Sequence, residues 1–212
     1  RQRQMCIRDS QIHGPDLEGT PVEDSWGTMV RLVEEGKTRA IGVSNYDPAL
    51  LEKCEAIRHV DSIQPEFSLL RRNTGPAEIA WADEQETGVI VYSPMGSGLL
   101  TDGFSSERIE RMAEGDWRRR SPRFQEPELS RILDLRDALG PVASRHDATI
   151  ADVAVAWTLA WPGVTGAIVG ARSAEQVDGW IGAASLELTD ADLEEIASAV
   201  ERSGAGEGPR RP

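Results

Sequence analysis

The apolar residues of this chain recur in short blocks with two different spacings. Apolar runs such as Ala40–Val43 and Val89–Tyr92 are typical of strands buried on both faces of a parallel sheet. Between these runs the apolar residues fall at helical spacing, as Trp26, Met29 and Val33 do. Strand and helix alternate at intervals of about 20 to 30 residues, which predicts βαβ units wound into a parallel α/β sheet.

The same pattern predicts the bounds of the elements. Strands are expected at residues 11–13, 40–43, 61–67, 88–92 and 165–170. Helices are expected at residues 21–35, 48–57, 77–86, 105–112, 129–146, 149–161, 174–181 and 193–200. Residues 115–127 are too polar and too often interrupted for a core element, so a surface loop or lid is predicted there.

Polar side chains stand at the ends of four consecutive predicted strands, at His13, Ser44–Asn45, Gln64 and Ser93. Active sites of α/β barrels are built at the carboxyl ends of the strands, so these side chains should converge. After the fourth strand the chain turns at Ser93, and two glycines follow that leave the backbone free to curl around a ligand. Strand-and-glycine loops also occur where nothing binds, and a purely structural loop is the alternative.

Composition narrows the range of partners. The 212 residues carry a formal net charge of −13 and are 39% hydrophobic, which supports a core but disfavours nucleic acid and anionic membranes as partners. Two cysteines fit a reducing compartment, and without a long apolar run or a signal peptide a cytoplasmic location is predicted. Three histidines without clustered carboxylate or cysteine partners predict no metal site.

Both ends of the chain differ from its middle. Residues 1–10 are basic in an acidic protein and lack a strand or helix pattern, so we interpret them as a non-native or disordered leader. An ordinary frayed terminus is the alternative. Residues 203–212 are rich in Gly, Pro and Arg and are predicted to be disordered, which leaves the α/β elements in 11–202.

Five stretches of the chain carry a family resemblance when they are taken in order. They are Gln11–Asp16, Ile41–Tyr46, Ile63–Phe67, Val91–Thr101 and Ala167–Arg172. Each is weak alone, but Gly-Val-Ser-Asn followed by Tyr-Ser-Pro-x-Gly-x-Gly-Leu-Leu is specific. Together they resemble the aldo-keto reductases, and the resemblance covers nearly everything from residue 11 to about residue 200.

The resemblance implies an α/β fold, a (β/α)8 TIM barrel that binds NADPH in an extended form across the carboxyl ends of its strands. By analogy, Ser44, Asn45 and Gln64 hydrogen-bond the nicotinamide carboxamide, which offers both a donor and an acceptor. Tyr92 would stack on the nicotinamide ring. Backbone N–H groups of the following loop would wrap the pyrophosphate, a role that falls on Ser93, Pro94, Met95, Gly96, Gly98 and Leu99.

The same resemblance assigns the adenosine end of the cofactor to Val169, Gly170, Ala171, Arg172 and Gln176. Arg172 would lie against the 2′-phosphate, which favours NADPH over NADH because a guanidinium pairs well with a phosphate. An ordinary solvated charge is the alternative for Arg172. Two departures from the family's pattern affect this end: Val169 stands in place of a proline, and Gly179–Trp180 in place of a Glu-Asn pair.

His13 resembles the catalytic histidine at the end of the fourth barrel strand, which orients the substrate carbonyl; the alternative is an ordinary polar residue. The family's other catalytic residues, an aspartate, a tyrosine and a lysine, lie on strands 1 to 3, whereas this chain resembles strands 4 to 8. Tyr46 and Tyr92 already have places in the resemblance. The predicted function is therefore NAD(P)H-dependent reduction of aldehydes or ketones, with this chain a truncated fragment that is inactive alone.

Two further hypotheses stay open at this stage. One is a non-catalytic, NADPH-binding regulatory subunit, and the other is a half-barrel that completes itself by oligomerising. Five strands cannot close a barrel that needs eight in register, and open edges would expose backbone hydrogen-bonding groups and favour aggregation. The expected partner is a small carbonyl substrate.

Overall fold

The computed structural model describes residues 7–16 and 18–211. The strands are β1 (Ile7–Ile12), β2 (Thr38–Ser44), β3 (Ser62–Gln64), β4 (Gly88–Tyr92) and β5 (Gly166–Ile168). The α-helices are α1 (Val22–Glu34), α2 (Pro48–Glu55), α3 (Ala80–Glu84), α4 (Ser106–Glu110), α5 (Glu128–Ala138), α6 (Gly140–Arg145), α7 (Ile150–Leu159), α8 (Ala174–Asp178) and α9 (Asp190–Ser203). Shorter 3-10 or π-helical turns are η1 (Gly75–Ile79), η2 (Gly96–Gly98), η3 (Trp117–Arg120), η4 (Pro122–Phe124) and η5 (Ile181–Ser185).

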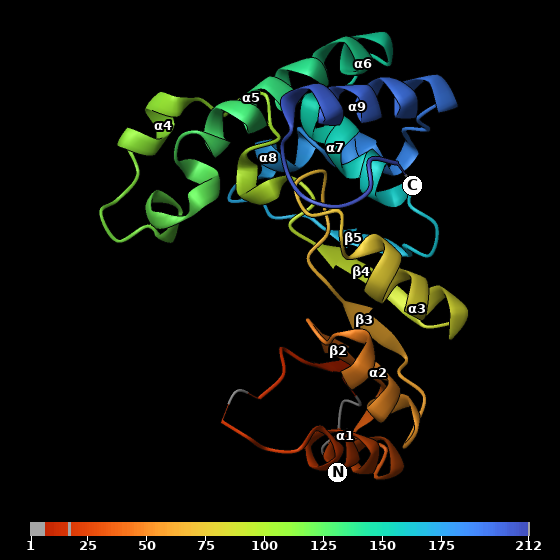
Figure 1. Ribbon diagram of the computed structural model, residues 1–212. Coiled ribbons are helices and arrows are strands. Elements are labelled where there is room, and N and C mark those ends of the chain that lie inside the picture. Colours follow the sequence, from red (N-terminus) through yellow and green to blue (C-terminus); the bar gives the residue numbers. More distant parts are fainter. Residues whose placement is uncertain (1–6, 17, 212) are drawn as a thin grey trace.

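The five strands of the described residues form one parallel sheet in chain order, with β1 and β5 at its two edges (Figure 1). The register pairs Ile12 with Val43, Val43 with Ile63 and Ile63 with Val89. Every pairing is parallel, so the carboxyl ends of all five strands lie on the same side of the sheet. The alternation of strand and helix in the sequence therefore predicted the α/β class and the parallel sheet, and the structure adds the strand order.

The two faces of the sheet differ in burial. Val43, Ile63, Val89 and Val91 are buried in the core. On the opposite face, Gln64, Ile90 and Tyr92 are only partly buried. The expectation that 89–92 is buried on both faces is therefore wrong: burial alternates along β4, and the uninterrupted apolar run concealed the alternation.

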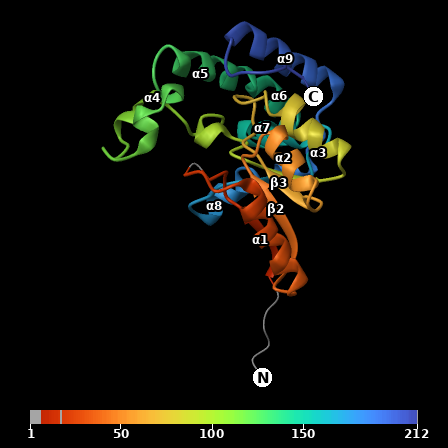
Figure 2. The same ribbon diagram turned by 60° about the horizontal axis from the view of Figure 1, so that its bottom comes forward.

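Helices cover the apolar face and also build a second layer beyond it. The helix α1 contacts β2 and α2, while α5 contacts both α6 and α9 (Figures 1 and 2). Phe67 links the sheet to this second layer by stacking on Trp157, with ring centroids 5.5 Å apart. No helix within residues 7–16 and 18–211 combines the length and the apolar character needed to span a membrane.

The first strand begins earlier than the sequence pattern indicates. β1 starts at Ile7, and Asp9 and Ser10 pair with Ala40 and Ile41 of β2. Residues 7–10 of the expected leader are therefore a strand rather than disordered, because parallel pairing with β2 orders a segment that has no clear alternation of its own. Residues 1–6 lie outside the described residues, and a non-native origin of this segment stays a prediction.

The chain after α9, which the composition predicts to be disordered, packs against Arg72 in the structure. The buried guanidinium of Arg72 donates hydrogen bonds to the carbonyl oxygens of Leu69, of Ala205 at 3.1 Å and of Pro209 at 2.9 Å. Burial lowers the pKa of Arg72 to about 10. A composition rich in Gly, Pro and Arg did not reveal this anchor, because the acceptors are backbone carbonyls.

Residues 115–127, for which a surface loop or lid was predicted, contain the two short turns η3 and η4. The helix α4 just before them falls within the helix predicted at residues 105–112 and lies to one side of the molecule (Figures 1 and 2). Phe124 is buried and packs edge-on against Phe104 and Trp117. The polar residues around Phe124 hid this small aromatic cluster from sequence analysis.

The start of α9 is held by Asp192, which is fully buried. One carboxylate oxygen accepts hydrogen bonds from the backbone and hydroxyl of Thr189, at 2.9 and 2.6 Å, and lies 2.9 Å from Nε2 of His146. The other accepts a hydrogen bond from Arg145. Burial opposes ionisation, but these hydrogen bonds hold the pKa of Asp192 below its ordinary value. The carboxylate thus ties α9 to the end of α6.

We expect Asp192→Asn to lower the free energy of unfolding by about 2–3 kcal/mol at pH 7, because it weakens a helix cap and charge-assisted hydrogen bonds together. The folded-state pKa lies below the unfolded value of about 3.9, so this stabilisation is present above that value and is lost as pH falls through the folded pKa. Urea unfolding at pH 7 and pH 3 measures both effects. Asp190→Asn, at an exposed residue of the same turn, is the control, and equal losses in the two variants would contradict the assignment.

Candidate cofactor cleft

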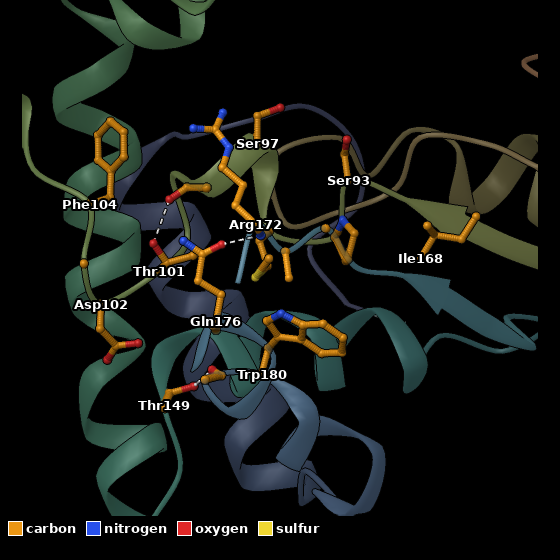
Figure 3. A pocket seen from close by; sticks show the side chains of 18 of the residues that line it. Ser93, Ser97, Thr101, Asp102, Phe104, Thr149, Ile168, Arg172, Gln176 and Trp180 are labelled. Carbon is orange, nitrogen blue, oxygen red and sulfur yellow. Dashed lines mark hydrogen bonds between the residues drawn. The ribbon is translucent and has the colours of Figure 1, made fainter. Parts of the chain in front are cut away.

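A cavity of about 820 Å³ lies at the carboxyl ends of β4 and β5 (Figure 3). Its walls come from the loop after β4, the turn after β5 and the start of α7. Nine of the residues predicted to bind a cofactor line it: Tyr92, Ser93, Pro94, Met95, Gly98, Gly170, Ala171, Arg172 and Gln176. The structure therefore brings together two sequence segments that are separated by about 70 residues.

The other predicted site residues form a hydrogen-bonded group at the neighbouring strand ends. The amide nitrogen of Asn45 donates to Oγ of Ser44 at 3.0 Å and to the carbonyl oxygen of His13 at 3.4 Å. The hydroxyl of Tyr92 donates to Oδ1 of Asn45 at 2.9 Å, and Oγ of Ser44 donates to the carbonyl oxygen of Gln64 at 2.7 Å. Asn45 thus connects the ends of β1, β2 and β4. His13 itself is exposed.

Tyr92 stands between this group and the cavity. Burial raises the pKa of its hydroxyl, and the nearby Glu66 acts in the same direction. The phenol is therefore neutral at physiological pH and remains a hydrogen-bond donor to Asn45. This bond fixes the orientation of the ring at the mouth of the cavity.

A second row of polar side chains crosses the same face of the sheet. Nε2 of Gln11 donates to Oγ of Ser62 at 2.8 Å, and Nε2 of Gln64 donates to Oε1 of Gln11 at 2.6 Å. Gln11 is paired with Gly42 in the register, and Gly42 is paired with Ser62. Gly42 lies between Gln11 and Ser62 and has no side chain to obstruct their contact. An added Cβ at Gly42 would collide with the backbone and hydroxyl of Ser62. Gln11 belongs to the first of the five stretches that carry the family resemblance, but the resemblance assigns it no role.

The loop after β4 folds largely on itself. Ser93, Gly96, Ser97 and Gly98 all have φ between +56° and +98°. The backbone N–H groups of Gly96 and Gly98 donate to carbonyl oxygens of Ser93 and Met95, at 2.9 and 3.1 Å. These two donors, which were expected to face a pyrophosphate, are already used within the loop. The curled backbone is thus stabilised by hydrogen bonds within the loop itself, and these two N–H groups are not free for a ligand.

Three predicted cofactor residues lie behind the cavity wall. A Cβ at Gly96 would come within 2.6 Å of a Leu70 methyl carbon, so Gly96 allows close packing rather than ligand approach. Leu99 is fully buried in the main core. Val169 packs with Val155 in a smaller cluster beside it. Their motif positions were recognised, but the side of the loop on which each would lie was not evident from the sequence.

The turn after β5 is exposed and open toward the cavity. The backbone N–H of Arg172 donates to Oε1 of Gln176 at 2.7 Å, which fixes the turn against α8 (Figure 3). A Cβ at Gly170 or at Gly98 would meet nothing within 4 Å, so both backbones border free space. The predicted residues of this turn therefore surround an accessible volume, with Val169 as the exception.

Several cavity residues had no assigned role in the sequence analysis: Ser97, Thr101, Asp102, Arg118, Thr149 and Trp180. Arg118 pairs with Asp116 at 2.6 Å, and this hydrogen-bonded partner lowers the pKa of Asp116 to about 2. The arginine run at 118–120 is the sequence signal for an anion contact at this wall. A smaller cavity of about 290 Å³ adjoins Tyr92 and is lined by the ion pair of Arg123 and Glu66, 2.7 Å apart.

No group of three His, Cys, Asp or Glu residues suited to a metal ion occurs in the described part of the chain. The arrangement suits an elongated organic anion better than a metal, since arginines and backbone line the walls.

Known proteins resemble this chain over most of its length. The model of the "Aldo/keto reductase family" matches residues 10–201. Aldo-keto reductase str7 of Strobilurus tenacellus is 31% identical over 93% of this chain and 59% of its own length. Aldo-keto reductase yakc [NADP(+)] of Schizosaccharomyces pombe is 28% identical over 93% of this chain and 58% of its own length. The chain thus spans less than two thirds of the curated relatives it matches.

Solved structures agree on the fold. The glycerol dehydrogenase AKR11B4 of Gluconobacter oxydans superposes with a TM-score of 0.86 at 28% identity, over 95% of this chain and 61% of that one. The thermostable aldo-keto reductase Tm1743 gives a TM-score of 0.67 at 22% identity, which concerns the fold alone.

The Gln11 crossing can be tested at Gly42. Gly42→Ala should lower the free energy of unfolding by about 1–3 kcal/mol, because the added methyl group overpacks against Ser62. Gly166→Ala is the matched control, since this strand glycine has nothing within 4 Å of an added Cβ. Chemical denaturation of both variants measures the difference, and an unchanged Gly42→Ala protein would show that the close contact does not matter.

Proposed function

The chain belongs to the aldo/keto reductase family, and from that membership we propose that it forms the NADPH-binding part of an oxidoreductase that reduces aldehydes or ketones to alcohols. One observation carries the proposal, namely the 820 Å³ cavity at the carboxyl ends of β4 and β5. This volume lies within the range of about 300–1,000 Å³ that small-molecule sites occupy. In α/β barrels, sites lie at this end of the strands.

The electrostatics of the cavity support an anionic ligand. The whole chain has a net charge of −13, yet three arginines line the cavity: Arg118, which is paired with Asp116, and Arg108 and Arg172; one carboxylate, Asp102, lines it as well. Arg172 and Gln176 stand at the turn that would hold the adenosine 2′-phosphate, and the name of the fission-yeast relative includes NADP(+). A phosphate would gain charge-assisted hydrogen bonds from a guanidinium there, which favours NADPH over NADH.

The strand-end group would orient the nicotinamide. Ser44, Asn45 and Gln64 carry hydroxyl and amide groups, and such groups match a carboxamide that both donates and accepts. Asn45 is exposed while its partners Ser44 and Tyr92 hold it in place, so it offers a fixed polar group at the surface. The ring of Tyr92, whose hydroxyl is bound to Asn45, provides a flat surface at the cavity mouth.

Reduced nicotinamide supplies the hydride for carbonyl reduction, and the developing alkoxide also needs a proton. His13 is exposed at the end of β1, where we propose that it orients the substrate carbonyl. The chain has two tyrosines: Tyr46 is buried, and the hydroxyl of Tyr92 donates a hydrogen bond to Asn45. Neither is placed to donate a proton, so we propose that proton delivery requires groups outside these 212 residues.

The binding half of the proposal predicts a micromolar Kd for NADPH with the 212-residue chain. Arg172→Ala should weaken NADPH binding by about tenfold and NADH binding by much less, because only NADPH carries the 2′-phosphate. Isothermal titration of both cofactors measures this. Arg131→Ala, an exposed arginine on α5 that does not line the cavity, is the control. Equal losses for NADPH and NADH would contradict the assignment.

The catalytic half predicts negligible carbonyl reduction by the same chain. NADPH oxidation with a small aldehyde should stay at the uncatalysed rate even when binding is saturated, because neither tyrosine of the chain is placed to donate the proton that the alkoxide needs. The decrease in absorbance of reduced nicotinamide measures the rate of NADPH oxidation directly. Turnover at ordinary enzymatic rates would show that a proton donor among these residues has been missed.

A further inference from the structure

Trp180 lies in the wall of the large cavity at the end formed by α7 and α8. In Figure 3 its indole lies near Gln176 and Thr149, on the other side of the view from Ser93 and Ser97. The hydroxyl of Thr149 donates to the carbonyl oxygen of Gly179 at 2.8 Å, which fixes the backbone just before the indole. Trp180 is partly buried, so part of a large aromatic surface remains accessible.

The polar groups beside this indole are already bound to other parts of the protein. The hydroxyl of Thr149 also takes part in the capping box with Asp152. Both carboxylate oxygens of Asp102 accept from the backbone N–H of Ile150, at 3.3 and 3.1 Å. Oε1 of Gln176 accepts from Arg172. This end of the cavity therefore has an aromatic surface, and its polar side chains are held in place by bonds within the protein.

The ring face of Trp180, and not its nitrogen, sets it apart from the core tryptophans. Nε1 of Trp180 is buried and has no hydrogen-bond partner among the residues that the structure describes, but the same holds for Nε1 of Trp157, which is fully buried in the core. Trp180 differs from Trp157 because it is only partly buried and lines the cavity, so its ring offers an aromatic surface to a ligand.

We infer that Trp180 is the base-binding residue of this cleft, and that it holds the adenine of the cofactor by stacking rather than by hydrogen bonds to its edge. The inference rests on the proposed function, since it assumes that a dinucleotide occupies the cavity with its nicotinamide at Tyr92. Stacking on an aromatic ring tolerates different bases because every base has a π face. The cleft should therefore discriminate weakly between adenine and other purines.

The test uses ligands that contain one half of the cofactor. Trp180→Ala should weaken the binding of NADPH and of 2′,5′-ADP by about tenfold, the size expected for loss of one base stack. Binding of reduced nicotinamide mononucleotide, which lacks the adenine, should not change. Trp180→Phe should bind 2′,5′-ADP within about threefold of wild type and Trp180→Leu should not, because only phenylalanine retains a π face. Isothermal titration supplies the Kd values.

Ile181→Ala is the matched control, because Ile181 is the exposed neighbour in the same turn and does not line the cavity. Circular dichroism confirms that each variant is folded. The hypoxanthine analogue of NADPH should bind wild type within about threefold of NADPH. Unchanged 2′,5′-ADP binding by Trp180→Ala, or equal binding by the Phe and Leu variants, would overturn the inference while leaving the proposed function intact. Absence of NADPH binding to wild type would instead contradict the proposed function as well.

Discussion

The candidate site depends on hydrogen bonds between polar side chains on the inner face of the sheet. Gln11 joins Ser62 and Gln64 across the middle of the sheet, and Asn45 joins the end of β2 to Tyr92 at the end of β4. Each bond connects different strands, so the carboxyl ends keep fixed relative positions. The bonds of Gln11 are partly buried, and partly buried polar groups are stable only when they are paired, so this pairing specifies one arrangement.

The sequence predicted helices well where apolar residues are frequent. The amphipathic α1 and the apolar α7, which is buried along most of its length, lie within the residue ranges predicted for them. The pattern was insufficient where order comes from the backbone of a distant segment. β1 is ordered by its pairing with β2, and the chain after α9 is held by Arg72. Neither interaction produces periodicity in the segment that it orders.

The site was predictable to the extent that strand ends converge. Ser44, Asn45, Gln64 and Tyr92 do lie together, because parallel strands place their carboxyl ends at one edge. Which loop residues face the cavity was not predictable. Gly96 and Gly98 are equivalent in the sequence, yet Gly96 packs against Leu70 and Gly98 borders free space. That difference arises from the direction of the loop, which depends on tertiary contacts that the loop's own sequence does not contain.

Backbone strain is concentrated at the same edge. Asn45, Ser93 and Ser97 all have φ near +60°, and each lies at or just beyond a strand end of the candidate site. Asn adopts this region more readily than most residues, whereas each serine there costs roughly 1 kcal/mol or more. Such conformations persist only where surrounding contacts fix them, and Asn45 is fixed by its bonds to Ser44 and Tyr92. Contacts at the strand ends that hold strained turns in place favour a preformed cleft over one that is shaped by its ligand.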